Sequence, residues 1–183
     1  MNPSTLSTVS TAKKTTHHRS RRAARQLALQ FLFQNEFQQR SSHSLDKFWE
    51  DHESAPEVQL FATQVVEGVF AHQKELDTLI NDYAVEWTLS RMPVVDRNIL
   101  RCAIFELFWL PEVPAKVTIN EALELAKRFA DEESKRFLNG ILDRIIQHDP
   151  QLAEKRLEII SQRESQTSPP NSDSSVDIGS WNT

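Results

Sequence analysis

Glycine and cysteine are both scarce in this sequence of 183 residues. Its three glycines, Gly68, Gly140 and Gly179, are far apart, whereas the loops that cradle phosphate need two or three glycines within a few residues. This spacing excludes a P-loop and disfavours a dinucleotide-binding fold. A many-stranded barrel or sandwich is disfavoured because its tight turns consume glycine. The single cysteine, Cys102, excludes an intrachain disulfide.

Long apolar runs are absent as well. The chain contains no stretch of about 18 apolar residues, so the sequence predicts no membrane span, and no apolar signal-peptide core follows the N-terminus. Hydrophobic residues make up 39% of the chain, below the usual value of about 45–50%. Part of the chain is therefore expected to lie outside the packed core. These features agree with a protein of the reducing cytoplasm.

Charge is distributed unevenly along the chain. Residues 1–25 contain six basic residues and no acidic one, and the rest of the chain carries a net charge of −11. A basic N-terminal arm on an acidic body favours a nucleic-acid partner. Two alternatives stay open, an incidental unstructured tail and an organelle transit peptide, since residues 1–20 are rich in Ser, Thr and basic residues and lack acids. The second alternative would place the protein in a plastid.

The ends of the chain differ in character from its middle. Serine and threonine are frequent in residues 1–19 and 165–183, so both segments are expected to be disordered. Between them, apolar residues recur every three to four positions and strand signals are few. The predicted fold is all-α, a single bundle of six to seven helices over residues 20–147. Residues 148–183 form a C-terminal extension, with room for one helix over 152–160 before the disordered tail.

Capping signals place some of the expected helix starts. Ser20 is a plausible N-cap for a helix over residues 20–37. Thr118 and Glu121 have the spacing of a capping box, which predicts a helix beginning at Thr118. The segment 94–110 is apolar on nearly every face, which predicts a helix in the middle of the bundle.

Two of the glycines fall inside expected helices. Gly68 is expected to allow a close approach between helices. Gly140 costs about 1 kcal/mol relative to alanine in a helix interior. A packing contact that excludes a side chain would justify that cost.

Catalytic signals are weak. None of the six histidines pairs at i, i+4 with another histidine or with the cysteine, as a helical zinc site requires. Cys102 falls on the most apolar helix and is expected to be a core filler. The acids Asp131, Glu132 and Glu133 stand at a helix start, where carboxylates are favourable. The sequence therefore predicts neither an enzyme nor a bound cofactor.

Recognition chemistry is better represented. Arginines stand in the first turns of the expected helix over 20–37, the unfavourable end for cations, so local helix stability does not explain them. Arginine pairs with phosphate and stacks on bases, and single-stranded RNA is read by aromatic and guanidinium planes. Phe33 and Phe137 are candidate stacking residues because each lies beside polar or basic residues. The alternative is that both are ordinary core residues.

Several segments resemble the NusB family of bacterial transcription antitermination factors. They are RRAAR at 21–25 with ALQ at 28–30, DRNILRCAIFEL at 96–107, VPAKVTINEALELAK at 113–127 and SKRFLNGILD at 134–143. The last two segments carry the most specific pattern. The similarity extends over residues 20–147 and leaves both tails outside.

The resemblance implies an all-helical protein that binds the single-stranded boxA element of ribosomal RNA leader transcripts. It acts with NusE, a small-subunit ribosomal protein, and thereby supports processive transcription by RNA polymerase, which it contacts indirectly. The resemblance implies RNA contacts for Arg21, Arg22, Arg25, Phe33, Lys116, Arg136 and Phe137. Asp96 and Glu133 fall near its NusE-contacting surface. Phe33 replaces a frequent tyrosine of the family, and Glu133 replaces a frequent aspartate.

Two alternative functions are a methyltransferase and a protein-binding adaptor. The same fold occurs as the N-terminal domain of certain rRNA cytosine methyltransferases, but only 36 residues follow Gln147, too few for their catalytic domain. The remaining rival is a helical adaptor that binds only proteins and whose basic arm is incidental.

Overall fold

The computed structural model describes residues 4–38, 44–85, 87–157, 159 and 161. Within these residues the chain forms seven α-helices and two 3-10 helices, with no strand, so the all-α prediction is confirmed. The elements are α1 (Ser4–Gln38), α2 (Ser44–Asp51), α3 (Pro56–Ala71), α4 (Gln73–Tyr83), η1 (Leu89–Arg91), α5 (Val94–Trp109), α6 (Ala115–Phe129), α7 (Glu132–His148) and η2 (Pro150–Leu152). Among them, no helix has the length and apolar character needed to cross a membrane.

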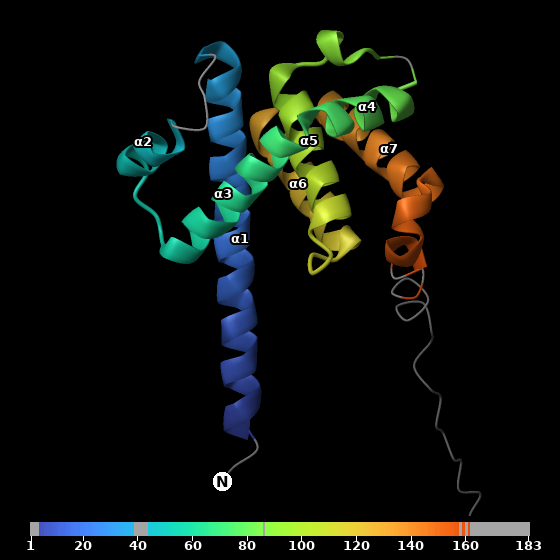
Figure 1. The fold of residues 1–183 in the computed structure, drawn as a ribbon. Helices are drawn as coiled ribbons and strands as arrows, with labels where there is room; N and C mark the ends of the chain where they lie inside the picture. Colours follow the sequence, from blue (N-terminus) through green and yellow to red (C-terminus); the bar gives the residue numbers. More distant parts are fainter. Residues whose placement is uncertain (1–3, 39–43, 86, 158, 160, 162–183) are drawn as a thin grey trace, which may run out of the picture.

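Helix α5 forms the centre of the bundle, as its apolar character predicts. It contacts α1, α3, α4, α6 and α7 (Figure 1). Most of its residues are buried, including four with polar side chains, Asp96, Asn98, Arg101 and Glu106. Burying such groups is costly unless they are paired, so their partners decide how the surrounding helices are held.

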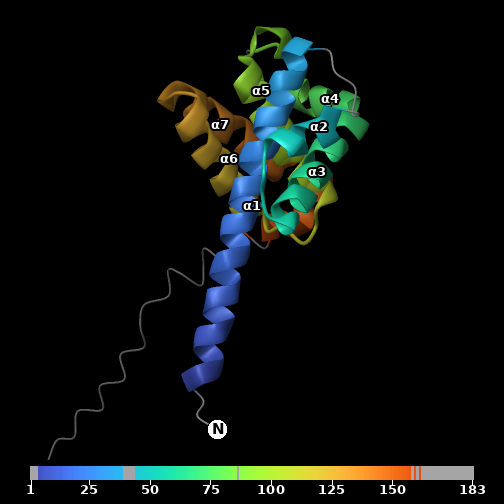
Figure 2. The same cartoon turned by 90° about the vertical axis from the view of Figure 1, so that its left-hand side faces the viewer.

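Helix α1 begins earlier than the sequence predicts. The structure starts it at Ser4 rather than Ser20, so the backbone is helical over residues 4–19, a segment for which the sequence predicts disorder. These residues contain neither glycine nor proline, and nothing in them interrupts the helix. The N-terminal part of α1 extends beyond the other helices in both views (Figures 1 and 2). Ser20 does not act as an N-cap, and its hydroxyl donates to Glu57 Oε1 at 3.4 Å.

Helix α6 also begins before its predicted start. Its N-cap is Pro114, whose carbonyl accepts from the backbone N–H groups of Val117 (2.9 Å) and Thr118 (3.1 Å). The capping-box prediction is therefore wrong, because Thr118 and Glu121 lie inside the helix and are buried. The Thr118 hydroxyl donates to Glu106 Oε2 at 3.4 Å instead. The sequence pattern assigns both side chains to a local cap, but in the structure they form hydrogen bonds with residues of α5 and α1.

Gly68 allows α3 and α5 to pack closely, as the sequence predicts. A Cβ atom built at this position would collide with the ring of Phe105 on α5. Gly140 behaves differently. A Cβ built there meets nothing within 4 Å among the described residues, so none of them makes the packing contact expected from the sequence.

The C-terminal extension is tied to two helix ends. Beyond η2, the backbone is helical over 153–157, inside the segment where one helix is expected. Lys155 Nζ donates to the carbonyls of Glu106, Leu110 and Val113 at 3.2–3.4 Å. Arg156 donates to the carbonyl of Ile146 at 2.8 Å. These bonds satisfy carbonyls at the C-terminal ends of α5 and α7. The tail over 165–183, predicted to be disordered, lies outside the described residues.

Candidate nucleic-acid interface

Arg25 is part of the core. Its side chain is 4% exposed, and Nε and Nη2 donate to the two carboxylate oxygens of Glu106 at 2.7 and 2.6 Å. The guanidinium also lies 5.3 Å from the centre of the Phe61 ring. This bidentate pair fixes α1 on α5. The resemblance implies an RNA contact for Arg25, whereas the structure places its guanidinium in the protein interior, paired with Glu106.

Arg21 and Arg22 are held by acids but keep contact with solvent. Arg22 forms a forked hydrogen bond to Glu121 of α6, with distances of 2.7–3.2 Å. That hydrogen bond raises the pKa of Arg22. Arg21 lies 4.0 Å from Glu112 and stacks over Phe61 at 4.7 Å. Tertiary partners thus account for arginines that local helix stability does not explain.

Phe33 lies at the surface of α1 and not in the core. It is 37% exposed and packs edge-on against Phe37, with ring centres 5.0 Å apart. Phe37 is 67% exposed and was missed as a candidate, although it continues the stripe of Leu29 and Phe33 at four-residue spacing. The C-terminal end of α1 therefore presents an exposed aromatic pair.

The start of α7 brings the two predicted partner-binding acids together. Asp96 and Glu133 both line a cavity of about 290 Å³ beside the α7 N-terminus. Asp131 caps the helix by accepting from the Ser134 backbone N–H at 2.7 Å. Hydrogen bonds from Ser134 lower the pKa of Asp131. The Ser134 hydroxyl donates to Asp96 Oδ2 at 2.8 Å.

Asp96 is an unusual carboxylate. It is 2% exposed, and its Oδ1 is buried without a hydrogen-bond partner among the described residues. Burial raises the pKa of Asp96, the hydrogen bond from Ser134 opposes that shift, and the nearby charge of Asp131 adds to it. A buried acceptor without a partner is costly. A hydrogen-bond donor brought by another molecule would relieve that cost.

Phe137 connects this acidic cavity to a basic one. Its ring is tilted against Trp87, with ring centres 5.5 Å apart, and both residues line both cavities. The second cavity has a volume of about 330 Å³ and also contains Arg136 and Arg144. Trp87 is 47% exposed and was missed by the sequence interpretation. A tryptophan in the short connector between two expected helices was the available signal.

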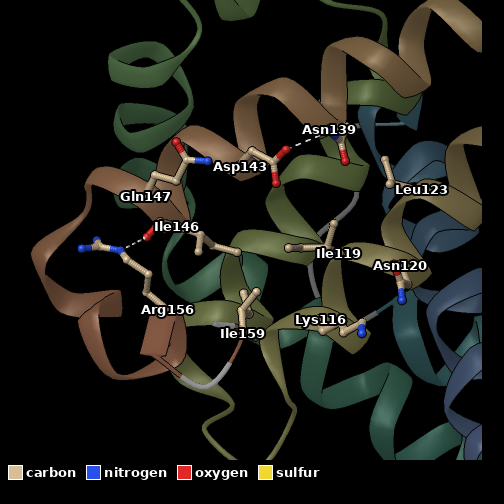
Figure 3. A pocket seen from close by; sticks show the side chains of 10 residues that line it. All are labelled: Lys116, Ile119, Asn120, Leu123, Asn139, Asp143, Ile146, Gln147, Arg156 and Ile159. Atoms are coloured by element: carbon tan, nitrogen blue, oxygen red, sulfur yellow. Dashed lines mark hydrogen bonds between the residues drawn. The ribbon is translucent and has the colours of Figure 1, made fainter. Parts of the chain in front are cut away.

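Lys116 lies apart from these residues. It borders a groove of about 520 Å³ between α6, α7 and the C-terminal extension (Figure 3). Ile119, Leu123, Ile146 and Ile159 supply the apolar part of its lining. On the rim, Asn139 Nδ2 donates to Asp143 at 3.0 Å. The structure therefore does not bring Lys116 into one cavity with Arg136 and Phe137.

Metal-binding groups and the cysteine can be assessed in the part of the chain that the structure describes. No group of three or more His, Cys, Asp or Glu side chains there could hold a metal ion. Cys102 is buried, as predicted, and burial raises the pKa of its thiol. A buried thiol with a raised pKa is a poor nucleophile.

Comparison with known proteins gives one consistent result. The model of the NusB family matches residues 22–147. The transcription antitermination protein NusB of Myxococcus xanthus is 44% identical over 131 residues, covering 69% of this chain and 94% of the relative. The protein of the same name from Thermodesulfovibrio yellowstonii is 39% identical over 140 residues, covering 70% and 93%.

Solved structures agree with the sequence relatives. NusB of T. maritima aligns with a TM-score of 0.66 at 35% identity, covering 75% of this chain and 96% of that one. A structure described as the antitermination factors NusB and NusE in complex with dsRNA aligns with a TM-score of 0.65 at 25% identity, covering 70% and 97%. Because the family model covers well over half of the chain, and the relatives match over most of their own length, this chain belongs to the NusB family.

Proposed function

We propose that this protein is a transcription antitermination factor that binds single-stranded RNA together with the ribosomal protein NusE. The observation that carries the proposal is the position of Phe137, between a basic cavity and an acidic one. A strand of RNA on the basic side and a basic protein on the acidic side would lie next to each other. Each would then help to hold the other, which is the property expected of a factor that binds the two together.

The RNA side consists of aromatic rings and of cations that are exposed or half-buried. Arg136 is exposed and Phe137 is partly buried beside it. Lys116, Arg21, Arg22 and the exposed Phe33 extend the candidate surface along α6 and α1. Arg25 acts here as a positioning residue, because its pair with Glu106 holds α1 in place. Phosphate contacts of this kind make affinity fall steeply with salt.

The protein side consists of Asp96 and Glu133. The buried Oδ1 of Asp96, which has no hydrogen-bond partner among the described residues, would accept a hydrogen bond from a cationic side chain. Exposed Glu133 would add to the negative field. The chain without its first 25 residues carries a net charge of −11. Charge of this sign favours association with a basic ribosomal protein.

The expected RNA target is a boxA-type element in ribosomal RNA leader transcripts. Loading of NusE and RNA onto the elongating RNA polymerase would promote processive transcription of ribosomal RNA operons in the bacterial cytoplasm. No chemical step is needed for this role, since the factor acts by holding two partners in contact.

Fluorescence anisotropy tests the proposal. A labelled boxA-like RNA and a scrambled RNA of equal length are titrated with the protein alone and with its NusE. We expect tighter binding to the boxA-like strand, strengthened by NusE, and a loss of that strengthening in Asp96→Asn. Equal and weak binding of both strands, with or without NusE, would instead favour the adaptor that binds only proteins.

A further inference from the structure

The basic cavity beside Phe137 differs from its surroundings in its lining. It lies where the end of α4 meets α7, and its residues are Ala84, Val85, Trp87, Arg136, Phe137, Gly140, Ile141 and Arg144. No acidic residue is among the described residues that line it. The adjacent cavity contains three acids, Asp96, Asp131 and Glu133, and one cation, Arg91. The described linings of the two cavities therefore carry net charges of opposite sign, and that of the first suits an anion.

Gly140 is the feature that the fold does not explain. Glycine is the poorest helix former after proline, yet Gly140 lies in the interior of α7. A Cβ atom there would meet no atom of the described residues within 4 Å, so no contact among them requires the absence of a side chain. Glycine at such a position lets another molecule approach the helix backbone closely. Gly140 lines the cavity, so the approach would be from that side.

Two arginines flank Gly140 on the same face of α7. Arg136 and Arg144 are each four residues away, which places their Cα atoms about 12 Å apart along the helix. Arg144 Nη1 donates to the Tyr83 carbonyl at 3.3 Å, which anchors the guanidinium at the end of α4. Among the described residues neither arginine pairs with a carboxylate, in contrast to Arg25 and Arg101. Their remaining donors are available to phosphate.

Trp87 supplies an aromatic surface in the same place. It packs against Phe137, which holds the indole in position, and it is half exposed. Nucleobases stack on exposed aromatic rings of this kind in proteins that bind single strands.

We propose that this cavity binds one nucleotide of single-stranded RNA. The base stacks on Trp87, the sugar or base edge contacts the backbone at Gly140, and the flanking phosphates pair with Arg136 and Arg144. The proposal rests on the RNA-binding function proposed above and adds Trp87, Gly140 and Arg144 to its surface. It also places the bound strand directly beside the acidic cavity that faces the protein partner.

Substitution of Gly140 provides the sharpest test, because stability and binding should move in opposite directions. Alanine is a better helix former and meets no clash, so Gly140→Ala should raise the Tm of the full-length protein by about 2–4 °C. The same substitution narrows the cavity and should weaken binding of a boxA-like RNA severalfold. Gly140→Leu fills the cavity and should weaken binding at least tenfold.

Two further variants test the phosphate and base contacts. Arg144→Gln should weaken binding about tenfold, the effect of losing one charge-assisted hydrogen bond. Trp87→Ala should have a similar effect, as expected for the loss of one stacked base. Lys74→Gln is the charge-matched control, since Lys74 lies at the opposite end of α4, and it should leave affinity unchanged within twofold. Thermal melts of all variants check that each is folded.

The outcomes separate this proposal from the one on which it rests. If the unmodified protein binds boxA-like RNA no better than scrambled RNA, the proposed function itself fails and this site fails with it. If the unmodified protein binds specifically while Gly140→Leu and Arg144→Gln bind equally well, the nucleotide site is overturned and the RNA-binding function stands. Loss of affinity in the folded Gly140 and Arg144 variants, with Lys74→Gln unaffected, supports the site.

Discussion

The α1–α3–α5 side of the molecule and the outer face of α7 treat the same residue types in opposite ways. On the first side the Arg25 guanidinium is paired with the Glu106 carboxylate, and the Phe105 ring occupies the space beside Gly68. On the α7 face, Arg136 and Arg144 have no carboxylate partner among the described residues, and the space beside Gly140 is open. An arginine or a glycine in a family motif therefore has no fixed meaning. Its tertiary surroundings decide whether it serves the fold or is available to another molecule.

The largest expected effect is on the packed side. Arg25→Ala leaves the Glu106 carboxylate buried without its partner and should lower the free energy of unfolding by about 3–5 kcal/mol. Urea denaturation measures the loss. The double variant Arg25→Met, Glu106→Leu removes both charges and should recover most of the stability. A single variant as stable as the unmodified protein would contradict the assignment of Arg25 to the core.

The two glycines give the next contrast. Gly68→Ala forces a methyl group into the Phe105 ring and should destabilise the protein by about 1–3 kcal/mol, as overpacking does. Gly140→Ala should be neutral or stabilising by up to about 1 kcal/mol. Thermal melts of both variants under one set of conditions make the comparison. Equal destabilisation by both would mean that the α7 face is as tightly packed as the α3–α5 contact.

Asp96 gives a contrast that depends on pH. Burial raises its pKa, so in the folded protein its ionisation opposes stability. The protonated carboxyl stabilises the folded protein fully at pH values below the ordinary pKa of an aspartate. This stabilisation is lost as the pH rises through the raised pKa of Asp96. The Asp96→Asn variant does not lose stability in this way, because an amide does not ionise. The free energy of unfolding of the variant, relative to the unmodified protein, should therefore rise between strongly acidic and neutral pH.

Urea denaturation across that pH range, performed on both proteins, gives the difference directly. A difference that stays constant or falls with rising pH would contradict a burial-dominated shift. The variant should also bind NusE more weakly, because an amide replaces the carboxylate that faces the cationic partner.

The smallest effect on stability is expected for substitution of Arg136, the exposed cation near the start of α7. Arg136→Gln should change the free energy of unfolding by no more than about 0.5 kcal/mol, as is usual for surface substitutions. It should lower the magnitude of the salt slope of RNA binding by about 0.7, the value for one phosphate contact with a single strand. Titrations at several salt concentrations measure the slope. An unchanged slope would remove Arg136 from the RNA surface.

Local sequence patterns reached the fold class but failed at two helix starts. The expected capping box at Thr118 and Glu121 and the expected N-cap at Ser20 are consistent with local rules, yet partners distant in sequence use all three side chains. For the candidate site, the motif residues Asp96, Glu133, Arg136 and Phe137 were predicted from the sequence, and the structure places all four at the two adjoining cavities. Trp87 and Arg144 were not predicted, because neither belongs to a local pattern that indicates binding.

The sequence by itself determined an all-helical bundle with α5 at its centre. Helical periodicity and an apolar surface on all sides are properties of the local sequence, and they do not depend on which helices pack against it. The tertiary structure alone decided which cations are available to bind. Arg25 is placed against Glu106, whereas Arg136 and Arg144 face an open cavity. The physical reason is that the availability of a charge depends on whether an opposite charge from a distant part of the chain lies within hydrogen-bonding distance, and only folding brings such groups together.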